Sequence, residues 1–419
     1  MRSWLVACVV CVVCVLASCA APGGTGRFAG SSNEEPDIRV LLAEGDRSYR
    51  VKAAGGVRVR SAEGLDIVRS TEPCEVIVSI RGSSVQVELD PSGDLGAVDG
   101  EAIILPADKS SLAFDGTRYA GVVRVIPGHE TMSLINVLPI ERYLEGVLPH
   151  ELGDPGADGY DALKSQAVAA RTYALGKIDM HKDGIFDVYA SVLDQVYRGV
   201  EGQNKVASAA VKDTRGRIID HDGRMVKAYY SACCGGHTSD IRRVWPDREP
   251  ADYLHGIPDR SADSDRAFCR DYRRFRWRYN FTGGQIGDIL RQTIPQELGV
   301  SEEDVGALKD IRVEERSHSG RVLRLTIETT QDTFSFEGDR IRWILETDPK
   351  KGRILPSVMF RLDKVMERDR VAFLSISGGG NGHGVGMCQT GSIAMAKKGY
   401  TYKMILTHYY PGCTIEKAY

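Results

Sequence analysis

Two glycine-rich polar segments carry the side chains with the clearest capacity for chemistry. Residues 377–389, SGGGNGHGVGMCQ, embed His383 and Gln389 among glycines. Because glycine lets a backbone approach a ligand closely and exposes its N–H groups, an imidazole and an amide can be aimed there without steric cost. Residues 229–238, YYSACCGGHT, gather hydroxyl, thiol and imidazole groups around a second glycine pair. Polar groups crowded at the end of a predicted strand indicate a site.

Several other interpretations of these segments compete. A phosphate-binding loop is disfavoured because no Gly-Lys-Ser/Thr follows the glycines, whereas a tight turn that packs a helix remains a structural alternative. A Cys-His hydrolase would need Cys388 paired with His383 or His237, and the chain has no Gly-x-Ser-x-Gly elbow. Zinc is disfavoured at the adjacent Cys233 and Cys234, because the Cys-x-x-Cys spacing typical of structural sites is absent.

Composition limits the class of protein. The chain has 419 residues, of which 42% are hydrophobic and 26% charged, so a wholly disordered chain is excluded. The formal net charge of −3 gives no global basic field for nucleic acid. The choice of partner must therefore come from a local site.

The N-terminus predicts export. Residues 1–18 contain one charge, Arg2, and an apolar run typical of a signal peptide, and residues 16–19, LASC, resemble a lipobox with Cys19 as the lipidated cysteine. A plain signal peptide is the alternative, and export follows from either. Residues 19–36 are rich in Gly, Ser and Pro and predict a flexible tether. In an oxidising compartment Cys233 or Cys234 can pair with Cys269.

Patterning divides the rest of the chain into two parts, which together predict an α+β fold. Short alternating apolar runs over residues 37–138 predict a β-rich N-terminal part, and residues 139–419 predict a mixed α/β part. Helical spacing over residues 140–148 and 160–180 flanks a predicted loop at residues 149–156. Glu151 would lie at this bend, with Asp158 or Asp161 capping the second helix.

Beyond residue 188 the pattern alternates between strands and helices. Apolar runs over residues 188–245 and 311–336 predict strands of a mixed sheet. Further helices are expected over residues 281–298, 341–345, 390–398 and 401–409, with Gly399 ending one of them.

The motifs resemble those of the stage II sporulation protein D family. The similar segments are LPIERYLEGVLPHEL at 138–152, ALKSQAVAARTYA at 162–174, SACCGGHT at 231–238, GHGVGMCQTG at 382–391 and YYPG at 409–412. They occur in the family's order across roughly residues 120–415, a span that chance composition does not produce.

This resemblance implies peptidoglycan binding and lytic transglycosylation of glycan strands, with Glu151 as general acid and base. Such an enzyme cleaves the bond between N-acetylmuramic acid and N-acetylglucosamine and leaves 1,6-anhydro ends. One carboxyl group suffices, because the substrate's own C6 hydroxyl replaces the water that a second carboxylate would activate. Apolar neighbours should raise the pKa of Glu151, and Glu145 is the fallback acid.

The resemblance also suggests residues that line the substrate cleft, between the Glu151 loop and the glycine loop. For Arg171 and Tyr173 a packing role inside the fold is an equal alternative. The expected substrate-binding residues are Lys164, Gln166, Arg171, Tyr230, Thr238, His383 and Gln389.

One departure from the family pattern concerns metal. Some members bind zinc through a His-x5-Cys-x5-Cys-Gln segment, but here His181 to Gln195 contains no cysteine, and Val188 and Asp194 stand near those places. We therefore expect no metal and no cofactor, with Cys234 and Cys269 in a disulfide or free. The family also includes amidase enhancers, so a non-catalytic, membrane-anchored partner of a cell-wall amidase is the alternative function. A role in sporulation does not follow from the family name.

Overall fold

The structure is a computed structural model that describes residues 34–107, 110–348 and 351–419. The expected signal peptide, Cys19 and most of the expected tether lie outside the described residues. Within the described residues, no helix combines the length and apolar character needed to cross a membrane.

The N-terminal part is built from strands, as the alternating pattern predicts. Two sheets, in the orders β13-β1-β12-β11-β8-β3-β4 and β10-β9-β2-β5-β6-β7, enclose one apolar core. The burial pattern of β2 shows why, since Tyr49, Val51 and Ala53 alternate with exposed residues along the strand. The strands are β1 (Asp37–Asp46), β2 (Ser48–Ala53), β3 (Val57–Ser61), β4 (Asp66–Ser70), β5 (Cys74–Arg81), β6 (Ser84–Asp90), β7 (Asp94–Asp99), β8 (Ala102–Pro106), β9 (Leu112–Phe114), β10 (Thr117–Tyr119), β11 (Val122–Pro127), β12 (Met132–Pro139) and β13 (Val188–Tyr189).

Helices α1 (Ile140–Glu151), α2 (Tyr160–Met180) and α3 (Lys205–Asp213) form the centre of the molecule. Two apolar cores meet along α2, so this helix is buried on most of its surface and its alanines allow close packing. This packing also buries the charged side chain of Arg171 completely.

Three local expectations were wrong around these helices. The predicted loop begins three residues later, because α1 continues through Pro149 to Glu151. Neither Asp158 nor Asp161 caps α2, since a 3-10 turn, η1 (Ala157–Gly159), leads into that helix. Helix α3 replaces part of the expected strand region, and Asn204 caps it by accepting the backbone N–H of Ala207.

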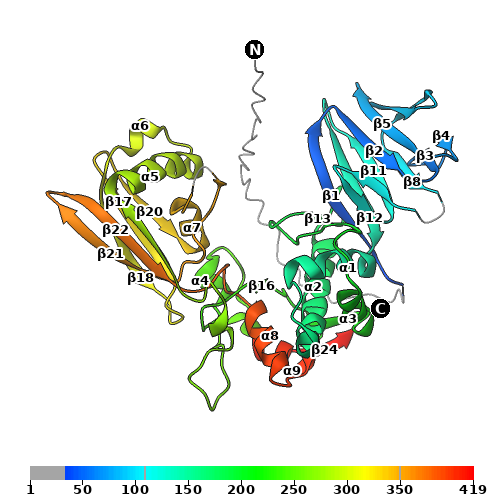
Figure 1. The fold of residues 1–419 in the computed structure, drawn as a ribbon. Coiled ribbons are helices and arrows are strands. Elements are labelled where there is room, and N and C mark those ends of the chain that lie inside the picture. Colours follow the sequence, from blue (N-terminus) through cyan, green and yellow to red (C-terminus); the bar gives the residue numbers. More distant parts are fainter. Residues whose placement is uncertain (1–33, 108–109, 349–350) are drawn as a thin grey trace.

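A second lobe surrounds α5 (Gly283–Leu298) and lies on the opposite side of the helical centre from the β-rich part (Figure 1). The strands expected in one mixed sheet instead divide among several small sheets, including β17-β22-β21 and β18-β19-β20 here. The other elements of this lobe are β17 (Trp277–Thr282), α6 (Glu302–Val305), β18 (Leu308–Arg316), β19 (Val322–Thr329), β20 (Thr333–Glu337), η4 (Gly338–Arg340), α7 (Ile341–Ile344), β21 (Phe360–Glu367) and β22 (Arg370–Gly378).

The remaining segments bring the C-terminus back to the centre. Strand β16 pairs in parallel with β23, which aligns Tyr230 with Met387 and Ser231 with Cys388. This pairing places the two glycine-rich segments side by side. The elements are β14 (Arg217–His221), β15 (Arg224–Met225), β16 (Tyr230–Ser231), α4 (Ile241–Val244), η2 (Asp252–Leu254), η3 (Phe268–Asp271), β23 (Met387–Cys388), α8 (Gln389–Lys397), α9 (Tyr402–Tyr409) and β24 (Thr414–Lys417).

Candidate active site

Glu151 is the last residue of α1 and is partly exposed. Helix α1 is fixed by fully buried side chains such as Tyr143, Leu144 and Leu148. The backbone N–H of Val196 donates to Oε1 of Glu151 at 2.8 Å, and the side-chain amide of Gln389 lies 3.4 Å from Oε2. The carboxyl group is therefore positioned by both the chain after β13 and the start of α8.

The environment of Glu151 favours its protonated form. Burial raises the pKa of Glu151, and the hydrogen bonds from Val196 and Gln389 lower it by less. The C-terminal end of a helix carries partial negative charge, which also disfavours a carboxylate at this position. A carboxyl group with a raised pKa and partial exposure is suited to general acid catalysis.

Gln389 links Glu151 to the core of α2. Its side-chain nitrogen lies 3.4 Å from Oε1 of Gln166, a residue with no exposed surface. Within the part of the chain that the structure describes, Nε2 of Gln166 has no hydrogen-bond partner. The structure thus brings Glu151, Gln166 and Gln389 together, as the family resemblance suggested.

Tyr230 belongs to the same site through Gln195. The side-chain amide of Gln195 donates a hydrogen bond to the hydroxyl of Tyr230 (2.9 Å) and accepts one from the hydroxyl of Tyr143 (3.1 Å). Burial, with a further contribution from the charge of Glu151, raises the pKa of both tyrosines. Both hydroxyls therefore keep their protons and remain hydrogen-bond donors at neutral pH.

A row of partly exposed aromatic rings extends from Tyr230. The ring of Tyr173 lies 6.5 Å from that of Tyr230 and 6.3 Å from that of Tyr229, and Tyr229 lies 5.0 Å from Trp245. Apolar faces with a few fixed polar groups are typical of small-molecule and sugar sites.

The structure does not bring the other predicted residues to Glu151. Arg171 is fully buried and forms an ion pair with Glu141 at 2.7 Å. The hydroxyl of Thr238 bonds to the backbone of Ile257, and Lys164 pairs with Asp161 at 2.9 Å. Each of these three side chains has a partner within the fold.

His383 also has its partners within the fold. Its Nε2 contacts the carbonyl oxygen of Tyr230 at 2.9 Å, and its Nδ1 accepts the N–H of Val385 at 3.0 Å. Burial lowers the pKa of His383 to about 4, so its ring is neutral at pH 7. Both ring nitrogens already have partners within the protein. A Cβ at Gly384, which has a φ of +78°, would meet Arg321 at 2.0 Å, so the glycine serves close packing.

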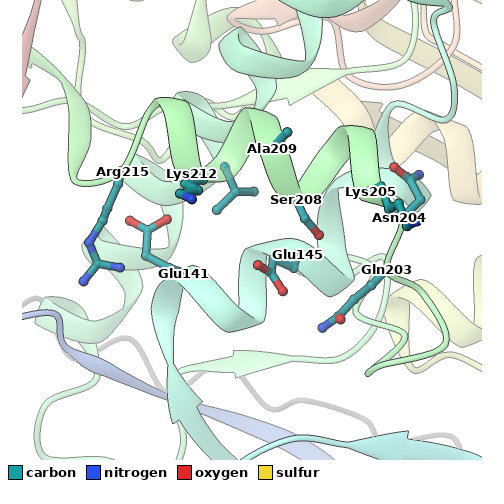
Figure 2. A pocket seen from close by; sticks show the side chains of 10 residues that line it. Glu141, Glu145, Gln203, Asn204, Lys205, Ser208, Ala209, Lys212 and Arg215 are labelled. Carbon is teal, nitrogen blue, oxygen red and sulfur yellow. The ribbon is translucent and has the colours of Figure 1, made fainter.

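Glu145, the fallback acid, lies elsewhere. It forms an ion pair with Arg142 at 2.6 Å. Together with Glu141 it lines a hollow of about 760 Å³ between α1 and α3 (Figure 2). Glu151 does not line this hollow.

Comparison with known proteins agrees with the motifs. Residues 128–221 match the model of the stage II sporulation protein family, and residues 244–386 match a domain of unknown function, DUF8618. Stage II sporulation protein D of Bacillus subtilis is 25% identical over 309 residues, which cover 70% of this chain and 79% of that protein. The chain belongs to the stage II sporulation protein D family.

Two further relatives differ in the share of their own length that the chain matches. An uncharacterized protein of Brachyspira hyodysenteriae is 32% identical over 385 residues, covering 90% of this chain and 92% of that protein. The amidase enhancer of Bacillus subtilis is 26% identical over 302 residues, which are 65% of this chain and 40% of the enhancer. The chain thus spans less than half of the enhancer's length.

The segment that binds zinc in some members of the family does not fit a metal ion here. The carboxylate of Asp187 pairs with Arg39 at 2.6 Å, and that of Asp194 pairs with Lys177 at 2.6 Å. Nδ1 of His181 contacts the carbonyl oxygen of Asp187 at 2.7 Å. Because two cationic side chains already neutralise the two carboxylates, these offer no net negative charge to a divalent cation.

Two contributors to the site were missed from the sequence. Gln195 closes the segment after His181 and holds Tyr230, and Val196 donates its backbone N–H to Glu151. Gln195 could have been found from the sequence, because it matches the final Gln of the family's His-x5-Cys-x5-Cys-Gln segment. The backbone donor carries no residue-type signal.

Proposed function

We propose that this chain is a peptidoglycan lytic transglycosylase that cleaves the bond between N-acetylmuramic acid and N-acetylglucosamine. The observation that carries the proposal is Glu151, a partly exposed carboxyl group whose pKa is raised by burial. The hydrogen bonds to Glu151 in the described residues come from Val196 and Gln389 and not from a second carboxyl group. This favours a reaction that uses one carboxyl group over hydrolysis, which generally uses two.

The reaction needs two proton transfers at one carboxyl group. Protonated Glu151 donates its proton to the glycosidic oxygen as the bond to C1 of the muramyl residue breaks. The C6 hydroxyl of the same residue then attacks C1, and Glu151 accepts the proton that this hydroxyl releases. The product is a 1,6-anhydro ring, and the carboxyl group returns to its protonated state.

The surrounding side chains suit a polar, ring-shaped substrate. The hydroxyl of Tyr230 and the amide of Gln389 offer hydrogen bonds near Glu151, and the buried Gln166 holds Gln389 in place. The rings of Tyr229 and Trp245 offer apolar surface for the faces of further sugars along the strand.

The test is mass spectrometry of muropeptides after incubation of the full chain with intact and with peptide-stripped peptidoglycan. Wild type should produce 1,6-anhydromuramyl ends, and Glu151→Gln should produce none. Glu145→Gln is the matched control, because this residue lies on the same helix and pairs with Arg142 outside the site. Equal loss in both variants would refute the assignment of Glu151, and comparison of the two substrates shows whether stem peptides must first be removed.

A non-catalytic role as an enhancer of a cell-wall amidase is the second candidate, favoured by the 26% identity to the amidase enhancer. On this alternative, wild type and Glu151→Gln bind sacculi equally and release no anhydro ends. Both then increase the rate at which an added cell-wall amidase releases stem peptides.

We further propose that the chain is exported and anchored to the membrane through a lipid on Cys19. The apolar leader and the LASC sequence support this location. Cys19→Ala should move the protein from the membrane fraction to the soluble fraction and abolish incorporation of labelled fatty acid. Retention in the membrane fraction without label would contradict the lipid anchor.

A further inference from the structure

Three thiols and one carboxylate converge in the core behind the candidate active site. The ligand atoms of Cys234, Asp259, Cys269 and Cys388 all lie within 4.8 Å of one another, and each residue is fully buried. The four residues come from distant segments: the turn after β16, the loop before η3, η3 itself and the end of β23.

The separation of two of the sulfurs fits a shared metal ion. The sulfurs of Cys234 and Cys269 lie 3.7 Å apart. A disulfide requires about 2.05 Å between sulfurs. Two thiolates bound to one tetrahedral zinc ion, each at about 2.3 Å, lie about 3.8 Å apart. The observed separation therefore matches an edge of a zinc tetrahedron.

The carboxylate lacks a cationic partner. Asp259 accepts hydrogen bonds from the hydroxyl of Tyr409 (2.6 Å) and the backbone N–H of Cys269 (3.1 Å). Among the described residues, no cationic side chain belongs to the groups that interact with Asp259. An ionised carboxylate in a fully buried position is costly unless a cation compensates it. A bound divalent ion supplies that charge.

The third sulfur is held in place by backbone donors. Sγ of Cys388 accepts the backbone N–H groups of Cys234 (3.2 Å) and Gly391 (3.4 Å), the second of which belongs to the first turn of α8. These two contacts fix the position of the sulfur within the group of four ligand atoms.

We propose that Cys234, Asp259, Cys269 and Cys388 bind one Zn²⁺ ion in a closed, four-coordinate structural site. Three thiolates and one carboxylate fill the tetrahedron, which leaves no position for substrate. The ion fixes the start of α8, where Cys388 is followed directly by Gln389, and so it holds the amide that contacts Glu151. The proposal does not depend on whether the chain is an enzyme.

This site departs from the expectation of no metal, which rests on local spacing. The intervals between residues 234, 259, 269 and 388 form no Cys-x-x-Cys rhythm, and of the adjacent pair only Cys234 belongs to the group. Only the fold brings the four residues together.

The first test measures metal in the full chain, purified in detergent without added chelator or reductant. Elemental analysis should give close to one zinc per chain, and replacement by Co²⁺ should give thiolate-to-cobalt charge-transfer absorption with tetrahedral d–d bands. Non-reducing peptide mapping of the same sample should find Cys234 and Cys269 unlinked. A metal-free protein, with these cysteines either linked or as free thiols, would overturn the proposal.

The second test uses matched cysteine variants. Cys269→Ala should lose the zinc, whereas Cys413→Ala should retain it, because Cys413 is buried in the same apolar core but lies outside the group. Asp259→Asn should weaken retention of zinc against a competing chelator and change the d–d bands of the cobalt form. Equal zinc content in Cys269→Ala and wild type would exclude these ligands. If a variant fails to fold, the cobalt spectrum of the wild type still decides.

Discussion

The buried ion pair between Arg171 and Glu141 yields the most exact prediction, because it decides whether Arg171 binds substrate or supports the fold. Arg171 donates to both carboxylate oxygens of Glu141, at 2.9 and 2.7 Å, and to the carbonyl oxygen of Arg217 at 3.1 Å. Arg171→Met keeps most of the volume but leaves a buried carboxylate without its cation. Removing one partner of such a pair costs about 3–5 kcal/mol in free energy of unfolding.

The assay is urea denaturation of the full chain with two controls. Lys164→Met removes a partly exposed ion pair on the same helix and should cost no more than about 1 kcal/mol. The double variant Arg171→Met with Glu141→Leu removes both charges and should recover much of the lost stability. A stable Arg171→Met protein that no longer binds glycan would refute the structural role and restore Arg171 as a substrate ligand.

The same pair predicts how stability depends on pH. Burial alone raises the pKa of Glu141, but hydrogen bonds and charge from Arg171, the hydroxyl of Tyr419 and the N–H of Gly216 together lower it below its ordinary value. A carboxyl group with a lowered pKa in the folded state contributes stability above its unfolded pKa and loses it as pH falls through its folded pKa. The difference in free energy of unfolding between wild type and Arg171→Met should therefore become smaller as the pH is lowered.

Three further predictions concern the candidate site. Because the acid must be protonated and the pKa of Glu151 is raised, turnover should fall as pH rises through that pKa, which a pH–rate profile measures. Gln389→Leu removes a hydrogen bond that lowers the pKa of Glu151, so the alkaline limb of the profile should move to higher pH; an unmoved limb would remove Gln389 from the acid's environment. Trp245→Ala should weaken sedimentation with sacculi several-fold, whereas Trp343→Ala, a 45% exposed tryptophan in α7, should not.

The sequence predicted elements well where a pattern is local. Alternation identified the N-terminal part as β-rich, and Gly399, with a φ of +85°, follows the end of α8 as expected. Pro149 misled because a proline in the last turn removes one backbone hydrogen bond at a place where the helix is about to end. Helix α3 was missed although Asn204 provided a cap signal, since the short apolar runs around it are ambiguous between helix and strand.

The candidate site was predicted only in part, because residue type does not reveal what a side chain is already bonded to. Glu151, Gln166 and Gln389 meet as the motifs suggested, but Arg171 and Thr238 are polar residues committed to internal partners. Their partners come from distant parts of the sequence, so only the tertiary structure reveals them. The contact that holds Glu151 most closely is a backbone N–H, which no motif encodes.

The position of Glu151 bears on the choice between an enzyme and a binding protein. A carboxylate that only accepts hydrogen bonds from sugar hydroxyls works best when ionised, and a solvated or cation-paired position would favour that state. Glu151 instead ends a helix and is buried enough to raise its pKa. It accepts hydrogen bonds from two neutral donors, and among the described residues no basic side chain lowers its pKa. The helix end, the burial and the lack of a basic partner make ionisation harder and proton donation easier, and the two hydrogen bonds offset this effect only in part. This arrangement costs stability at neutral pH, where the unfolded carboxyl group would be ionised. Glu151→Gln should therefore be no less stable than wild type at pH 7, and a clear destabilisation would argue that the carboxylate serves binding rather than acid catalysis.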